Sequence, residues 1–240
     1  MISWRTADDD RQLLKRGAHQ FGVALSEEQV RLFIIFLQGL WSWNRSMNLT
    51  GITEKRQMLI QLLLDPLVAL PYLPSNGALL DVGSGAGIPG LPLKIARPEY
   101  EVHLLEAKAK KVSFLRDMIR KVGLTGITAC QGRAGKSGDL PALLNGYDIV
   151  TARALAPLKK TIRLCRPYIS PGGLLLTFKG ADIDREIASS QEVMEELGFS
   201  IETEAAYRLP ETPGERHLLV LKRNPSERRI VTHDGCHKRT

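Results

Sequence analysis

Residues 79–90 read LLDVGSGAGIPG, and this stretch decides the fold class of the 240-residue chain. The apolar run at 79–82 predicts a buried strand, and glycines at 83, 85 and 87 predict a tight turn that a ligand can approach closely. Pro89 suits the first turn of a following helix, where its missing N–H costs little. Free backbone N–H groups at the start of that helix suit an anionic ligand group such as a carboxylate. The segment therefore predicts a ligand-binding turn between a strand and a helix.

Short apolar runs alternate with amphipathic segments around this turn. The predicted strands are 78–82, 101–105, 127–131, 147–151, 173–178, 199–206 and 216–222. The predicted helices between them are 90–96, 108–122, 137–144, 157–168 and 183–197. Such alternation predicts an α/β fold with a doubly wound, mostly parallel, seven-stranded sheet. The last two strands are joined without a helix, which predicts a hairpin that closes one edge.

The first seventy residues are predicted to be helical. Ser26 and Gln29 match a capping box, and a helix over 27–43 follows. Its apolar stripe consists of Val30, Phe33, Ile34, Leu37, Leu40 and Trp41. The spacing favours a core position for Trp41, although the Trp41/Trp43 pair could also stack on bases. Two further helices are predicted. A shorter one precedes residue 27 and includes Leu13, Leu14, Ala18 and Phe21, and another follows Thr53 and runs to about Leu64. We therefore predict a helical extension over 1–70, an α/β core over 71–223 and a mobile basic tail over 224–240.

Charge and composition limit the classes of partner. The chain has 33 Lys and Arg against 26 Asp and Glu, a net charge of +7. Residues 222–240 carry a net +4 and residues 108–121 a net +5. Such clusters attract polyanions, although a solvated helix face and a soluble tail would look the same. Three scattered cysteines, no signal peptide and no apolar run long enough for a bilayer predict a soluble cytoplasmic protein without a membrane partner.

Two classes of ligand compete for the glycine turn. Gly85, Gly87 and Gly90 satisfy G-x-G-x-x-G, and Glu106 follows 21 residues after Gly85 at a strand end, where an acid can accept from ribose hydroxyls. This pattern allows an NAD-dependent oxidoreductase. Asp81, however, extends it to D-x-G-x-G-x-G, which resembles motif I of the class I S-adenosylmethionine methyltransferases. Since no sizeable second domain is available for hydride chemistry, the methyltransferase is favoured.

Further motifs narrow the resemblance. The motifs are Trp43-Asn44 followed by Asn48-Leu49-Thr50, Leu62-Leu63-Leu64-Asp65, the turn from Asp81 to Gly90, Lys110-Lys111 with Phe114-Leu115, Thr151-Ala152-Arg153-Ala154, Phe178-Lys179-Gly180 and Gly214-Glu215-Arg216-His217. In this order they resemble the glucose-inhibited division protein B family, the bacterial ribosomal RNA small subunit methyltransferases G. The resemblance covers about residues 25–223.

The resemblance implies a fold, a reaction and a set of site residues. The fold is the Rossmann-like class I methyltransferase fold, and the reaction is transfer of a methyl group from S-adenosylmethionine to N7 of guanine 527 in 16S rRNA, free or in a small-subunit assembly particle. The implied cofactor-binding residues are Asp81, Gly83, Gly85, Gly87, Ile88, Glu106 (to the ribose), Ala134 and Gly135 (beside the adenine) and Arg153. Arg153 and Asn48 are implied to position the substrate. This chain departs from the family pattern at Gln61, Pro66 and Gly135, where the family has His, Ser and often Glu.

The chemistry requires few catalytic groups. N7 of guanine carries an in-plane lone pair and need not lose a proton, so catalysis asks mainly for proximity and orientation. We therefore expect no acid–base residue and no metal, and we interpret His233, Cys236 and His237 as solvated tail residues. Lys108, Lys110, Lys111 and Arg153 are the candidates for RNA phosphates. Because the major groove of A-form RNA is too narrow for side chains, the target base must be unpaired or splayed out. A non-catalytic RNA-binding protein on the same fold stays an alternative, and we expect a monomer.

Overall fold

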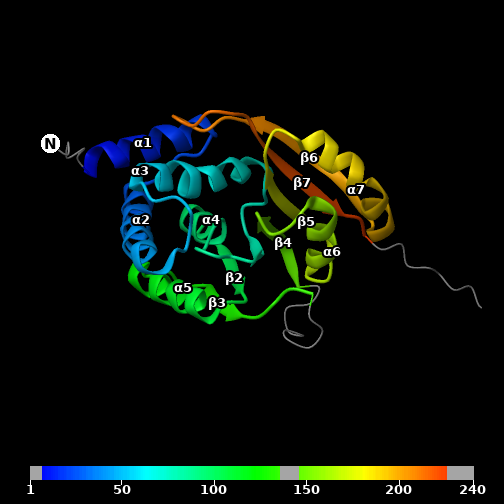
Figure 1. Cartoon of the computed structure of the whole chain (residues 1–240), viewed down its shortest axis with the longest axis horizontal. Helices are drawn as coiled ribbons and strands as arrows, with labels where there is room; N and C mark the ends of the chain where they lie inside the picture. Colours follow the sequence, from blue (N-terminus) through cyan, green and yellow to red (C-terminus); the bar gives the residue numbers. More distant parts are fainter. Residues whose placement is uncertain (1–6, 136–145, 226–240) are drawn as a thin grey trace, which may run out of the picture.

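The computed structural model describes residues 7–135 and 146–225 and contains one seven-stranded sheet (Figure 1). The strands are β1 (Gly77–Val82), β2 (Tyr100–Glu106), β3 (Ile127–Gln131), β4 (Tyr147–Arg153), β5 (Ile169–Lys179), β6 (Phe199–Tyr207) and β7 (Arg216–Arg223). Their order is β3-β2-β1-β4-β5-β7-β6, with β7 antiparallel to both neighbours and the other pairings parallel. The predicted seven-stranded, mostly parallel sheet with a closing hairpin is confirmed.

Helices cover both faces of the sheet. The helices after β1 are α4 (Gly90–Ala96), α5 (Ala109–Val122), α6 (Leu158–Cys165) and α7 (Ile183–Leu197). One apolar core lies between the sheet and α4 and α5, and a second lies between the sheet and α6 and α7. Alternating residues of β1 divide between the two cores, since Leu79 belongs to the first and Leu80 to the second. The central strands are therefore buried on both faces, as parallel strands usually are.

The N-terminal helices pack on the α4–α5 side of the sheet (Figure 1). They are α1 (Ala7–Gln20), α2 (Glu27–Met47) and α3 (Lys55–Met58), followed by a π-helical turn η1 (Leu59–Leu64) and a 3-10 segment η2 (Asp65–Tyr72). The predicted capping box starts α2, with Ser26 and Gln29 bonded reciprocally. Buried residues of these helices belong to the same core as α4 and α5. The extension is therefore structurally continuous with the sheet, whereas the exact boundaries of our three segments stay predictions.

Two details of the N-terminal prediction are wrong. Trp41 is 39% exposed rather than buried, and the guanidinium of Arg45 stands 5.5 Å from its ring centre. Phe36 takes the core position instead. The helix predicted to end near Leu64 continues to Tyr72, because η1 and η2 extend it without a break.

Some predictions fall outside the described residues, namely the helix at 137–144 and the tail beyond Pro225. Within the described ranges, no helix is both long and apolar enough to cross a membrane.

Candidate functional site

The strand order creates a crevice at one edge of the sheet. The chain runs outward from β1 to β2 and β3, and then returns to β4 on the other side of β1. Ligands of open α/β sheets bind at the carboxyl ends of the strands where the order reverses in this way. The glycine turn follows β1 and Arg153 ends β4, so both predicted elements meet at this point.

The glycine turn has one face that is packed and one that is open. A Cβ on Gly87 would stand 2.4 Å from a methyl carbon of Leu91, so the turn closes tightly on α4 there. Gly85 has φ +57°, and a Cβ added to it would have no neighbour closer than 3.8 Å. The space over Gly85 is therefore open to a ligand, whereas a side chain at Gly87 would disturb the packing of the turn against α4.

Asp81 holds the turn from inside the protein. Its carboxylate is fully buried, accepting 2.9 Å from the hydroxyl of Thr151 and 3.2 Å from the N–H of Gly90. Burial raises the pKa of Asp81 to about 6, against the lowering effect of these hydrogen bonds. The bonds join β1, β4 and the start of α4, so the contacts observed for Asp81 are with the protein rather than with the open face of the turn.

Glu106 lies beside the open face of the turn. Its Oε2 accepts a hydrogen bond of 3.0 Å from the N–H of Gly85, and its Oε1 accepts one of 2.8 Å from the N–H of Lys108. Each carboxylate oxygen can accept a second bond, so both retain capacity for hydroxyl donors. The predicted pair of turn and acid is thus adjacent in space.

Ala134 and Gly135 follow β3 on the same edge of the sheet. Gly135 has φ +82°, a conformation that side chains rarely adopt, and a Cβ there would stand 2.7 Å from a methyl carbon of Leu164. The family often has Glu at this position, but glycine suits both the backbone conformation here and the close approach of Leu164.

Arg153 points from the end of β4 toward the N-terminal helices. Its Nη2 donates 2.8 Å to the backbone oxygen of Gln61 and lies 3.1 Å from Oδ2 of Asp65. The next residue, Ala154, has φ +50°, and this left-handed backbone turns the chain away directly after the arginine.

Asn48 ends α2 in the left-handed conformation, and its side chain is exposed. The buried partner in this motif is Asn44, which accepts from the N–H of Thr50 and donates to the carbonyl of Ile52. The W-N-x-x-x-N-L-T motif therefore builds the loop after α2. A substrate contact by Asn48 stays a prediction.

The three predicted RNA-binding lysines differ in their surroundings. Lys108 and Lys110 are exposed at the start of α5, whereas Lys111 is half-buried. The Nζ of Lys111 lies 3.8 Å from where a Cβ on Gly85 would stand. Lys111 is therefore next to the glycine turn, while the other two face outward.

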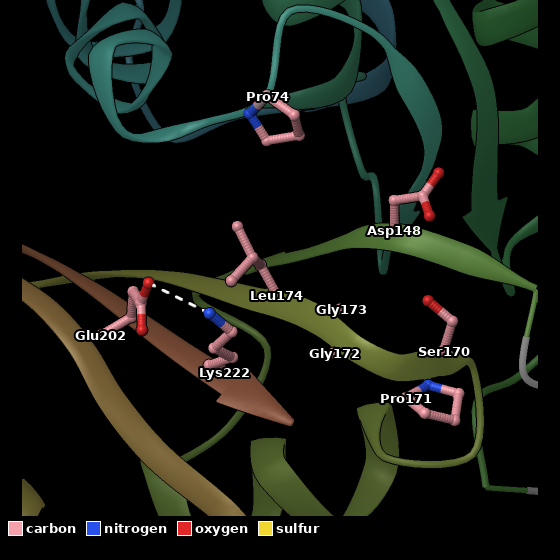
Figure 2. A pocket seen from close by; sticks show the side chains of 9 residues that line it. All are labelled: Pro74, Asp148, Ser170, Pro171, Gly172, Gly173, Leu174, Glu202 and Lys222. Atoms are coloured by element: carbon pink, nitrogen blue, oxygen red, sulfur yellow. Dashed lines mark hydrogen bonds and ion pairs between the residues drawn. The ribbon is translucent and has the colours of Figure 1, made fainter. Parts of the chain in front are cut away.

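A separate cavity of about 290 Å³ lies at the opposite edge of the sheet, at the amino ends of β4 and β5 (Figure 2). Its polar groups have partners within the protein. Asp148 accepts from the N–H of Ala78, Ser170 donates to the carbonyl of Tyr147, and Glu202 pairs with Lys222 at 3.4 Å (Figure 2). This cavity is remote from the glycine turn and offers no reactive group.

The arrangement fits S-adenosylmethionine. An open glycine backbone, a buried acid with spare acceptor capacity and the Ala134-Gly135 loop lie along one edge of the sheet. Among the described residues no cluster of potential metal ligands is present, and His233, Cys236 and His237 lie outside them. Burial raises the pKa of both described thiols, Cys130 and Cys165, which disfavours a thiolate nucleophile.

Comparison with known proteins identifies the family. The family model for rRNA small subunit methyltransferase G (GidB) matches residues 29–218. The chain belongs to this family. The Ribosomal RNA small subunit methyltransferase G of Acetivibrio thermocellus is 36% identical over 214 residues, covering 89% of this chain and 88% of the relative. That of Caldanaerobacter subterraneus subsp. tengcongensis is 37% identical over 214 residues, covering 88% and 89%.

Solved structures show the same fold in proteins of much lower sequence identity. The fibrillarin pre-rRNA processing protein of Methanococcus jannaschii aligns with a TM-score of 0.52 at 17% identity, over 64% of this chain and 70% of that one. TYW2 of Pyrococcus horikoshii, solved in complex with MeSAdo, aligns with a TM-score of 0.52 at 16% identity, over 67% and 62%. These likenesses establish the Rossmann-like methyltransferase fold.

Sequence reasoning missed three parts of the site. Asp65, Thr151 and Arg216 all occur in the family motifs quoted above, but none of them was assigned a role from the sequence. A polar residue at the end of an apolar strand or helix is the sequence signal that could have identified them. Arg216, for example, contacts Gln61, which lies 155 positions earlier in the chain, and no local pattern reveals such a contact.

Proposed function

We propose that this protein methylates N7 of guanine 527 in 16S rRNA, with S-adenosylmethionine as methyl donor. The observation that carries the proposal is the meeting of the glycine turn, Glu106 and Arg153 at the reversal point of the sheet in a chain of this family. The substrate places its action in the cytoplasm, on 16S rRNA or a small-subunit assembly particle. We propose that it acts as a monomer.

The residues of the site divide between the methyl donor and the RNA. Asp81 fixes the turn, Gly83, Gly85, Gly87 and Ile88 line the donor pocket, Glu106 accepts from the ribose hydroxyls, and Ala134 and Gly135 border the adenine. Arg153 and Asn48 face the RNA, Lys108 and Lys110 meet its phosphates, and Lys111, beside the glycine turn, faces the methyl donor. When bound, S-adenosylmethionine supplies a methyl group that its sulfonium charge has already activated.

The protein contributes orientation and exclusion of water rather than proton transfer. Guanine N7 is a nucleophile without deprotonation, so no general base is needed. When the protein holds the methyl group and N7 in line, a bimolecular step becomes effectively unimolecular. This is the main source of the rate enhancement in such a reaction.

The test is the mapping of N7-methylguanine in rRNA from cells with and without this gene. We expect the modification at guanine 527 to disappear on deletion and to return when the gene is restored. Purified protein with S-adenosylmethionine should modify the same base in vitro. Binding of a nicotinamide cofactor without binding of S-adenosylhomocysteine would instead indicate an oxidoreductase, and rRNA binding without methylation would indicate a non-catalytic RNA-binding protein.

A further inference from the structure

A fully buried carboxylate, that of Asp65, lies where the N-terminal helices meet the carboxyl edge of the sheet. Its Oδ1 accepts a hydrogen bond of 2.6 Å from the hydroxyl of Tyr207, at the end of β6. Its Oδ2 lies 3.1 Å from Nη2 of Arg153 and 3.6 Å from Nη1 of Arg216, which end β4 and begin β7. One carboxylate therefore connects three strands to η2.

The two arginines also share Gln61. Arg153 donates to its backbone oxygen at 2.8 Å, and Arg216 donates to its Oε1 at 3.5 Å. Two cations this close repel each other unless a negative charge lies between them. Asp65 supplies that charge and leaves the trio with a formal charge of +1.

The exposure of the three side chains indicates which groups face a ligand. The side chain of Arg153 is 17% exposed and that of Arg216 is 26% exposed, whereas that of Asp65 is completely enclosed. Oδ2 of Asp65 has no hydrogen bond of good geometry among the described residues, although two guanidiniums lie near it. The carboxylate therefore acts as a shared counter-charge behind two guanidiniums whose outer edges reach the surface. Guanidinium groups in a fixed orientation suit planar recognition of phosphates and carboxylates.

We infer that Asp65 is a positioning residue that holds Arg153 and Arg216 convergent on one oxyanion, a phosphate of the RNA strand beside the target guanosine. The inference rests on the proposed function. A carboxylate on the methyl donor has the same chemistry, so the experiment measures the two ligands separately.

The first variant is Asp65→Asn, which keeps the shape and the acceptor for Tyr207 but removes the counter-charge. The affinity of the variant for 16S rRNA or for small subunits should stay the same or increase, because the site gains positive charge. The single-turnover rate of methylation at saturating RNA should fall at least ten-fold, because the guanidiniums no longer hold the strand in the reactive position. The affinity for S-adenosylmethionine should change less than two-fold.

A second variant, Tyr207→Phe, keeps the inference testable if Asp65→Asn does not fold. It removes the hydroxyl that fixes Oδ1, so the single-turnover rate should fall about three- to ten-fold. Because Tyr207 acts through Asp65, the double variant should be no slower than Asp65→Asn alone. Asp148→Asn, at the opposite edge of the sheet, is the matched control and should react at the wild-type rate.

The outcomes separate the alternatives. A lower melting temperature with an unchanged rate for the folded protein would overturn the inference in favour of a purely structural ion pair. A ten-fold loss of S-adenosylmethionine affinity with an unchanged single-turnover rate at saturating donor and RNA would overturn the assignment to RNA. The two arginines would then bind the carboxylate of the methyl donor. Failure of the proposed function is distinguishable, since in that case the wild-type protein would not methylate the RNA at all.

Discussion

At the scale of single residues, the site depends on groups that are enclosed by the protein as much as on groups that face a ligand. Asp81 has no solvent exposure, yet its two hydrogen bonds hold β4 and the start of α4 against the glycine turn. Glu106 plays the same part on the open side through the N–H groups of Gly85 and Lys108. Changes at these residues therefore act on both the shape of the turn and its ligand.

The open face of the turn is tested by Gly85→Val. A β-branched residue at φ +57° costs about 1–3 kcal/mol of strain, and its side chain occupies the space over the turn. We expect loss of S-adenosylmethionine binding in isothermal calorimetry with the fold kept. Gly198→Val, at φ +71° and with open space around it at the end of α7, is the matched control and should lose stability but keep affinity. Equal binding by both variants would remove the turn from the donor site.

The acid at the end of β2 is tested by Glu106→Gln. The amide nitrogen cannot accept a hydrogen bond, so at least one contact with a backbone N–H or a ribose hydroxyl is lost. A hydrogen bond to a charged group contributes about 1.5–3 kcal/mol, so affinity for S-adenosylmethionine should fall roughly 10- to 150-fold. Glu101→Gln, exposed on the same strand, should leave the affinity unchanged. If the two variants bind alike, Glu106 does not hold the ribose.

Buried Asp81 predicts a specific dependence of stability on pH. Its pKa rises from 3.8 in the unfolded chain to about 6 in the native protein. Between these values the native state holds a proton that the unfolded state releases, so the contribution of Asp81 to the free energy of unfolding falls as pH increases. The total fall is about 3 kcal/mol, and it levels off about one pH unit above the native pKa. In Asp81→Asn this contribution is absent. Urea unfolding from pH 3.5 to 7 should show the variant gaining stability relative to wild type as pH rises; parallel curves would mean that Asp81 ionises normally.

At the scale of elements, the path from α3 to η2 changes helical type twice. The α-helical turn Lys55–Met58 passes into the π-helical turn Leu59–Leu64 and then into the 3-10 segment Asp65–Tyr72. π-helical turns occur frequently at functional sites, where they shift the direction of side chains. Here the change of type places Gln61 and Asp65 beneath Arg153. The segment therefore links the extension to the edge of the sheet that carries the site.

Helix α5 begins with lysines in two different positions, and we predict two functions. Lys108→Ala with Lys110→Ala removes two exposed charges, which should weaken RNA binding and reduce its log–log salt slope by up to about 1.4, since each single-strand phosphate contributes about 0.7. S-adenosylmethionine affinity should be unchanged.

Lys111→Ala should instead weaken S-adenosylmethionine binding, because its Nζ lies beside the turn. The measurements are filter binding of RNA at several salt concentrations and calorimetry with the donor. An unchanged salt slope would show that the first two lysines are only a solvated surface.

At the scale of the whole molecule, one apolar core extends from α1 through the N-terminal helices to the sheet. Trp43 of α2 contributes to this contact, since its Nε1 donates 3.0 Å to Asp117 of α5 and its ring packs edge-on against Phe114. A core shared in this way implies that the extension and the sheet unfold together.

Cooperative unfolding is checked with two probes and one core variant. Tryptophan fluorescence, which reports the tryptophans at positions 4, 41 and 43 of the N-terminal extension, and far-ultraviolet circular dichroism should give coincident transitions in urea. Phe36→Ala, at a fully buried position in α2, should lower the free energy of unfolding by about 3–5 kcal/mol in both signals. Ile201→Ala, 43% exposed on β6, should change it by less than about 0.5 kcal/mol. Two separate transitions would show that the extension is an independent unit.

The strand–helix alternation, the glycine turn and the neighbouring acid could all be predicted from the sequence. These features follow local rules, because strands and helices repeat at different periods and only certain residues permit tight turns. The family motifs added the reaction and most of the candidate site, from Asp81 to Arg153. Periodicity was less informative at helix edges. Trp41 lies on the flank of the apolar stripe of α2, and whether a flank is covered depends on the neighbouring helices.

Which of these residues contact one another depends on the tertiary structure. Asp65, Arg153, Tyr207 and Arg216 come from four segments, and their contacts depend on strand order and on the antiparallel insertion of β7 between β5 and β6. Likewise, Lys111 lies beside the glycine turn and Lys108 faces solvent because of where α5 passes the turn. Local sequence determines backbone conformation through short-range sterics and hydrogen bonding, whereas the distance between charges far apart in the chain is set by packing of the whole molecule.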